Sequence, residues 1–176
     1  MGRKERYVLA MALLLVVGLA TAWAGYSATT TISASSISNF PSVSGEGTIY
    51  LQNLKKGAWF YRGETPVFTI DVPSGFSGDI NVTVGVANMG QIASMFDALE
   101  INVTLKDSNN KVEDQDFISL QGGISTVVLG APSPAGKTYN VVVTISGKVA
   151  KSATSSSVNI IMYCSVRPAG AVEVQT

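Results

Sequence analysis

Apolar and polar residues alternate with a period of two along most of the chain, a pattern typical of half-buried β-strands. The clearest runs are Ile80–Val86 and Leu99–Leu105. Two late strands are expected at Thr138–Ser146 and Ser157–Ser165, and shorter ones at Asp116–Leu120 and Thr126–Leu129. The side chains predicted to face the core are Ile49, Leu51, Phe68, Ile70, Val72, Ile80, Val82, Val84, Val86, Leu99, Ile101, Val103 and Leu105.

Clusters of Gly, Pro, Asn, Asp and Ser separate these runs and predict turns. Only Gly90–Leu99 favours a helix, because Ile92, Met95 and Phe96 follow the i, i+3, i+4 spacing. We expect one or two helical turns packed over a sandwich edge. Many short strands with frequent turns predict an all-β fold, an antiparallel β-sandwich or jelly roll, in one domain over residues 41–176.

The N-terminus has the pattern of a secretory signal peptide over residues 1–24. Three basic residues precede the apolar run Tyr7–Leu19, and Ala22–Ala24 fits the small-x-small cleavage rule. We therefore expect a secreted, extracellular protein that meets the membrane only through this transient segment. Two alternatives remain, an uncleaved anchor near the lower length limit of a membrane span and a pilin-type leader. The leader would be cut before the apolar run, where Glu5–Tyr7 offers no small residue.

The next segment, residues 25–40, is an uncharged ribbon with strand-like alternation. One face would carry Tyr26, Ala28, Thr30, Ile32 and Ala34, and the other only Ser and Thr. Such small side chains fill a narrow groove better than they build a core. The ribbon is either an edge strand or leader of its own sandwich, or a donor strand and linker that completes the sheet of a neighbouring subunit.

Composition removes several classes of function. The chain has no His, one Cys and a formal net charge of zero. It therefore lacks the commonest general base and transition-metal ligand, cannot form an intramolecular disulfide, and presents no basic patch for nucleic acid. We predict no enzyme activity, cofactor, metal site or nucleic-acid partner. Cys164 shares the inward strand face of Val158, Ile160 and Met162, which predicts a small buried apolar residue.

Four carboxylates gather in one segment, at Asp107, Glu113, Asp114 and Asp116. Oxygen ligands of this kind suit Ca²⁺, but the spacing matches no EF-hand loop. The alternative interpretation is a solvated turn.

Two N-x-T sequences make Asn81 and Asn102 candidate glycosylation sites. In both, the strand phase turns Asn and Thr outward and the central Val inward. The alternative is coincidence in a chain rich in Asn and Thr.

Several segments resemble the TasA/camelysin family. They are the aromatic-Ser step at Gly25–Ser27, the "SGEGTIYL" of Ser44–Leu51, the "RGETPVFTIDV" of Arg62–Val72, and Val82–Leu105. In length and style the chain is most similar to archaeal bundling pilins, with archaeal thread filaments a near alternative. The resemblance implies exported jelly-roll subunits that polymerise by inserting an N-terminal strand, here Tyr26–Ile37, into the groove of the next subunit.

The chain departs from the family in two places. Ala28 stands where bacterial members usually carry an acidic residue. The metalloprotease activity described for camelysin is not expected, because the chain lacks His and any HExxH motif. The hypothesis is a homopolymeric filament subunit with lateral filament–filament contacts that supports bundling, adhesion and biofilm formation. The alternative is a monomeric cell-surface β-sandwich that binds carbohydrate or an S-layer.

Overall fold

The computed structural model describes residues 39–132 and 134–170. The predicted signal peptide and the predicted donor face (Tyr26, Ala28, Thr30, Ile32 and Ala34) lie outside the described residues. Among the described residues, no helix has the length and apolar character needed to cross a membrane.

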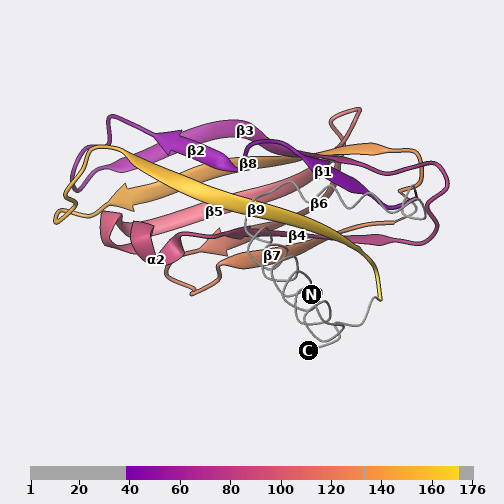
Figure 1. The fold of residues 1–176 in the computed structure, drawn as a ribbon. Coiled ribbons are helices and arrows are strands. Elements are labelled where there is room, and N and C mark those ends of the chain that lie inside the picture. The colour runs from indigo at the N-terminus through magenta and orange to yellow at the C-terminus, as the bar shows by residue number, and fades with distance from the viewer. Residues whose placement is uncertain (1–38, 133, 171–176) are drawn as a thin grey trace, which may run out of the picture. The chain divides into compact units, whose positions relative to one another are not determined.

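The described chain is an all-β sandwich of two antiparallel sheets (Figure 1), as the alternation predicted. One sheet has the strand order β1-β3-β8-β5-β6 and the other has the order β2-β9-β4-β7. The strands are β1 (Ser42–Ser44), β2 (Thr48–Leu51), β3 (Trp59–Asp71), β4 (Ile80–Val86), β5 (Phe96–Asp107), β6 (Val112–Ser119), β7 (Thr126–Ala131), β8 (Thr138–Val149) and β9 (Val158–Pro168).

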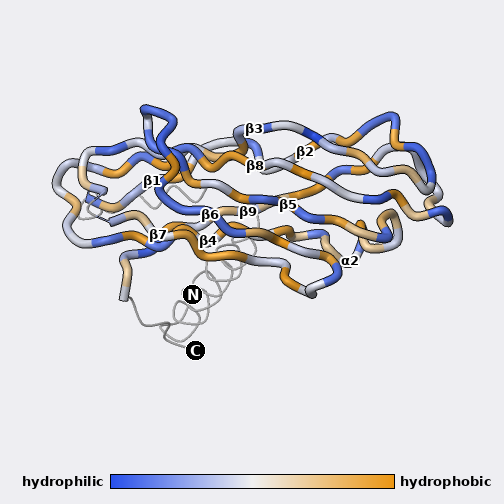
Figure 2. The backbone as a smooth tube through the Cα atoms, turned by 180° about the vertical axis from the view of Figure 1, so that it is seen from behind, coloured by the Kyte–Doolittle hydropathy of each residue, from blue (hydrophilic) through white to orange (hydrophobic). Residues whose placement is uncertain are grey.

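The core lies between the two sheets. The side chains predicted to face inward are buried there, except that Val158 and Cys164 are only half-buried. Tyr139 is fully buried, and its hydroxyl has no hydrogen-bond partner among the described residues. Figure 2 shows the cause, an alternation of hydrophilic and hydrophobic positions along the strands. Because each buried Val, Leu or Ile contributes about 1.5–3 kcal/mol, this alternation fixes which face of each strand turns inward.

The predicted helix is shorter than expected. It consists of α2 (Met89–Ile92) and a 3-10 turn, η2 (Ala93–Met95), and Phe96 already begins β5. Ile92 and Met95 are buried as the spacing required. The prediction was wrong from Phe96 onward, because Phe96 joins the sheet opposite Val149 and packs its ring 5.5 Å from that of Phe60.

The sequence pattern did not predict two strand segments. β1 is too short to show a period. The first half of β3, Trp59–Pro66, contains a register shift between Arg62 and Thr65, and a second shift follows it between Pro66 and Phe68. Each such bulge changes which face the following side chains occupy, so the alternation is lost.

Candidate functional site

One edge of the sandwich is closed by two short strands that lie on different sheets. The chain leaves β1, passes Gly45–Gly47 and enters β2 on the opposite sheet. A Cβ on Gly45, where φ is +124°, would lie 2.4 Å from the Val67 carbonyl oxygen. A Cβ on Gly47 would lie 2.2 Å from the carbonyl oxygen of Met162. Glycine is therefore required for so close a crossing.

The crossing leaves each sheet edge half covered. β1 pairs only with Thr69–Asp71 of β3, and β2 pairs only with Val158–Ile161 of β9. Over Met162–Pro168, β9 pairs with β4 on one side. No described strand pairs with its other side, although β1 lies close to β9, and we call this edge the open run. In Figure 1, β9 is the yellow ribbon in front, and β2 lies along its first half.

Hydrogen bonds at the start of the open run show which main-chain groups are free. Met162 N–H donates to Gly47 O (2.6 Å) on the β2 side, whereas Ile161 O accepts from Ala87 N–H (2.8 Å) on the β4 side. Because the direction alternates along an antiparallel strand, the main-chain groups of Cys164 and Val166 point away from β4. They form a ladder edge without a partner among the described residues.

The side chains beneath the open run are only partly covered. Cys164 and Val166 point inward and are half-buried, as is Val43 of β1. Ile160 and Met162, on the same face of β9, are buried. The prediction that Cys164 is buried was therefore too strong, because the neighbouring strand ends before reaching it. The burial it has raises the pKa of the thiol to about 12.

The matching half-edge on the other sheet, Trp59–Pro66 of β3, is protected against strand pairing. It carries two bulges and a proline without an N–H. Arg62 also reaches across to β2, with Nη1 donating to Tyr50 O (2.6 Å) and Nε to Thr65 Oγ1 (3.2 Å). Bulges, prolines and charges are the usual protection of edge strands. The open run of β9 pairs with β4 without a register shift, so it is the edge suited to accept a strand.

The two predicted glycosylation sites lie on the outer faces of different sheets. Asn81 is on β4 and Asn102 on β5, both half-buried, while Val82 and Val103 are fully buried. The predicted orientation is confirmed, and modification itself stays a prediction. Neither asparagine lies on the open run.

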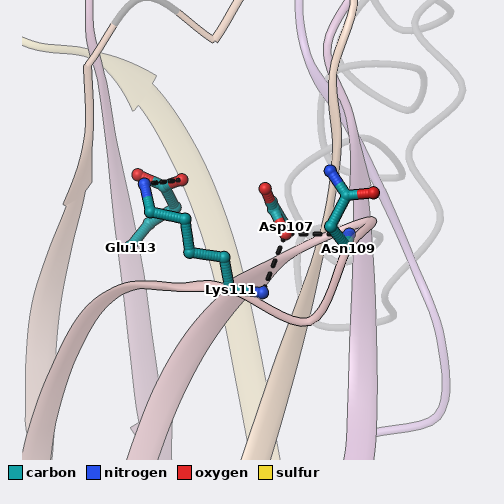
Figure 3. Close-up of polar contacts among 4 residues, drawn as sticks. All are labelled: Asp107, Asn109, Lys111 and Glu113. Atoms are coloured by element: carbon teal, nitrogen blue, oxygen red, sulfur yellow. Dashed lines mark hydrogen bonds and ion pairs between the residues drawn. The ribbon is translucent and has the colours of Figure 1, made fainter.

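The acidic segment forms the hairpin between β5 and β6 (Figure 3). Asp107 Oδ1 accepts the N–H groups of Lys111 (2.9 Å) and Asn109 (2.8 Å). The Lys111 bond is the main reason that the pKa of Asp107 is lowered. Lys111 Nζ lies 3.1 Å from Glu113 Oε1. These two carboxylates are therefore used to shape the hairpin.

The other two carboxylates of the segment bind main-chain groups. Asp114 Oδ2 accepts from Gly130 N–H (2.7 Å) on β7, and Asp116 Oδ1 from Phe117 N–H (2.8 Å). Across the described part of the chain, no three His, Cys, Asp or Glu side chains converge as a metal site would require.

No protein-family model matches the chain, and no curated protein matches it.

Proposed function

We propose that this protein is a structural subunit of an extracellular filament that polymerises by donor-strand complementation. The ribbon Tyr26–Ile37 of one subunit adds to the open run of β9 in the next. The observation that carries the proposal is a regular strand edge with free main-chain groups above a half-covered apolar strip. A strand added there gains ladder hydrogen bonds and covers Cys164 and Val166 at the same time.

The strand order supports a jelly-roll description. The sheets β2-β9-β4-β7 and β3-β8-β5-β6 are the two four-stranded layers of that fold, and β1 is an addition at one edge. In this description β2 is the first strand of its layer, yet it accompanies only the beginning of β9. The added ribbon extends the layer along the remainder of β9.

The chemistry of the ribbon suits the open run. Its proposed inner face carries two larger side chains, Tyr26 and Ile32, and otherwise only Ala and Thr, which fit beside the small side chains Cys164 and Val166. The main-chain groups of these two residues offer about four hydrogen bonds, worth about 0.5–1.5 kcal/mol each. Burying Ile32 adds about 1.5–3 kcal/mol. The gain is thus moderate at each junction and is repeated along a polymer.

Chain length favours a neighbouring subunit over antiparallel self-insertion. Asn39 lies beside Gly75, in the β3–β4 connection, at the end of the sandwich where Pro168 finishes β9. If the ribbon ran antiparallel to β9 of its own subunit, it would cross the open run, a length of about 23 Å. It would then end at the far side and have to run back the same distance to reach Asn39. The roughly 14 residues after the proposed cleavage span at most about 48 Å, which leaves none for the turn. A ribbon from another subunit has no such limit.

Lateral contact between filaments is supported by the outer face of the sheet β2-β9-β4-β7. Four exposed apolar side chains lie there, and Arg167, near one end, is the only charged residue that the described strands of this sheet direct outward. The exposed residues are Tyr50, Val128, Ile161 and Tyr163. The area is on the order of 400 Å², too small for a stable dimer but adequate for a contact repeated along a filament.

The test replaces Val166 by Asp, with Val112→Asp as the matched control, because Val112 is 45% exposed on β6, in the other sheet and outside both the open run and the lateral contact face. We expect the mature Val166→Asp protein to keep its circular dichroism spectrum but to remain monomeric in sedimentation and negative-stain microscopy. The control should still polymerise, and deletion of residues 25–37 should abolish polymers. Filaments of normal length from Val166→Asp would refute the assignment of the edge. A wild-type protein that stays monomeric at every concentration would refute the function.

A further inference from the structure

The outer face of the sheet β1-β3-β8-β5-β6 carries the two most exposed large apolar side chains of the described residues. Trp59 is 70% exposed and Tyr61 is 73% exposed. They are two residues apart on β3, so both rings project from the same face, with their Cα atoms about 6.6 Å apart. Phe60, between them, points inward, where its ring packs 5.5 Å from that of Phe96. The two exposed rings are therefore held side by side on a strand that is anchored in the core.

Hydrogen-bonding side chains share this outer face, because β3, β8 and β5 are consecutive strands of the sheet (Figure 1). Lys148 of β8 lies opposite Trp59. Ser146, two residues earlier on β8, lies opposite Tyr61, and Glu100 of β5 lies opposite Ser146. Side chains directly opposite each other point to the same side of a sheet, with Cβ atoms about 4.5–5.5 Å apart. These five side chains form one surface, which we call the aromatic face.

The charges of the aromatic face balance. It holds one cation, Lys148, and one anion, Glu100, and neither forms an ion pair with another described residue. The ion pairs of the described chain are formed elsewhere, by Lys106 and Lys111. An ammonium donor and a carboxylate acceptor on either side of a serine hydroxyl suit a ligand that both donates and accepts hydrogen bonds. A polyanion would be attracted by one of the two charges and repelled by the other.

The strand that carries the rings lies at an open border of its sheet. β1 pairs only with Thr69–Asp71 of β3, so no described strand pairs with Trp59–Arg62 on that side. A chain-like ligand can therefore lie along β3 over both rings, extend past the border, and still reach the side chains of β8 and β5.

From this combination we infer that the aromatic face binds a neutral polysaccharide. Pyranose rings with equatorial substituents present apolar C–H groups on their flat sides, and these stack on the rings of Trp59 and Tyr61. The hydroxyls around the sugar bond to the polar side chains of β8 and β5. This binding goes beyond the proposed filament and does not depend on it, although a filament would repeat the site in every subunit and raise the avidity.

A second copy of the chain and single-stranded nucleic acid are the competing occupants. The two rings offer on the order of 300 Å² of surface, whereas each partner of a stable protein interface contributes about 800 Å². The core of such an interface is also depleted of charge, but here Lys148 and Glu100 stand close to the rings. Single-stranded nucleic acid binds along a positively charged groove, and the aromatic face holds a single cation. The neutral polysaccharide is the occupant that fits both the rings and the balanced charge.

The experiment measures binding of cellohexaose, a neutral glucose oligosaccharide with a flat extended chain, to the full mature protein by tryptophan fluorescence and calorimetry. Trp23 and Trp59 are the two tryptophans of the chain, so after the proposed cleavage the emission reports Trp59 alone. We expect saturable binding whose Kd changes by less than about twofold between about 50 and 200 mM salt, a range over which phosphate contacts weaken strongly. Hexagalacturonate and a single-stranded oligonucleotide, both polyanions, should bind more weakly.

The variants are Trp59→Ala, Tyr61→Ala and Tyr61→Phe. Each alanine variant should lose at least about tenfold in affinity with an unchanged melting temperature, whereas Tyr61→Phe keeps the ring and should bind nearly as well as the wild type. The matched control is Phe117→Ala, because Phe117 is 47% exposed on β6, which β8 and β5 separate from β3. The control should bind normally.

Absence of saturable binding, tighter binding of either polyanion, or normal affinity in both alanine variants would overturn the inference. If Trp59→Ala disperses bundles of filaments and the wild type does not bind the oligosaccharide, the occupant is a second copy. The Val166→Asp protein, which should stay monomeric, presents the same aromatic face and should bind cellohexaose normally. Failure of the filament proposal and failure of this inference are therefore separate results.

Discussion

The open run is most directly tested by supplying its proposed partner as a separate molecule. A chain that starts at Asn39 keeps every described strand, so we expect it to fold as a monomer. A synthetic peptide with the sequence of residues 25–38 should then bind to it. Because the peptide binds only the folded form, it should raise the free energy of unfolding by mass action.

The size of the effect follows from the contact. About four ladder hydrogen bonds and one buried Ile give a gross gain of about 3.5–9 kcal/mol. Ordering the paired residues of the peptide offsets much of this gain, so the expected Kd is on the order of 1 mM or weaker. At a peptide concentration ten times its Kd, the free energy of unfolding rises by about 1.4 kcal/mol. For a domain of this size each kcal/mol moves the melting temperature by about 3–4 °C. The expected shift is therefore about 5 °C.

Differential scanning fluorimetry with a peptide titration measures this shift. A peptide carrying Ile32→Asp controls for non-specific binding, and a Val166→Asp domain controls for the edge that is occupied. In both controls the melting temperature should shift by less than 2 °C, because the stabilisation depends on the logarithm of the ratio of peptide concentration to Kd and becomes small when binding is weakened. The proposed edge is wrong if the melting temperature is constant up to about 10 mM peptide, or if the Val166→Asp domain responds like the wild type.

The alternation of the sequence determined the core, because a period of two leaves little doubt about strand faces wherever one face is buried. It failed where that period is broken. Trp59, Phe60 and Tyr61 are all apolar, so they show no alternation that would predict their faces, and the register shifts that follow separate them from the regular part of β3. A β1 of three residues is too short to show a period.

The open run could not have been predicted from the sequence. It depends on where β1 and β2 end relative to strands far away in the chain, which is a matter of register rather than of local pattern. The nearest signal was the glycine pair Gly45 and Gly47, which appeared to be an ordinary turn. Half-burial of Cys164 has the same origin, since the sequence gives its face but not the length of its neighbour.

Three further substitutions and titrations test the surrounding structure. Gly85→Ala would place a Cβ 2.4 Å from the ring of Tyr163 and should cost about 1–3 kcal/mol in urea unfolding, whereas Gly90→Ala, which meets nothing within 4 Å, should cost nothing. Cys164 should resist alkylation at pH 8 in the folded monomer. Its raised pKa contributes stability that is present below pH 9.0 and is lost as the pH rises towards about 12. The Cys164→Ala variant should not show this loss of stability. The lowered pKa of Asp107 contributes stability that is present above pH 3.8 and is lost as the pH falls through the pKa of the folded protein. In thermal melts, Asp107→Ala should therefore show a smaller fall of the melting temperature at acid pH.

The open run arises from the crossing of the chain between the sheets. Because β1 stops on one layer and β2 begins on the other, each layer keeps half an edge, and Gly47 is the position that permits it. A Cβ at Gly47 would lie 2.2 Å from Met162 O and 2.7 Å from Phe68 Cζ. Gly47→Ala must therefore separate β2 from β9 or displace the core.

We expect Gly47→Ala to lower the free energy of unfolding by about 2–4 kcal/mol, the combined cost of overpacking and of losing the Met162–Gly47 hydrogen bond. It should weaken polymerisation as well, because the open run continues β9 from the point where Met162 bonds to Gly47. If Gly47→Ala left both stability and polymerisation unchanged, the role of Gly47 in the crossing would be wrong, because the added Cβ cannot fit without moving β2 away from β9 or displacing the core.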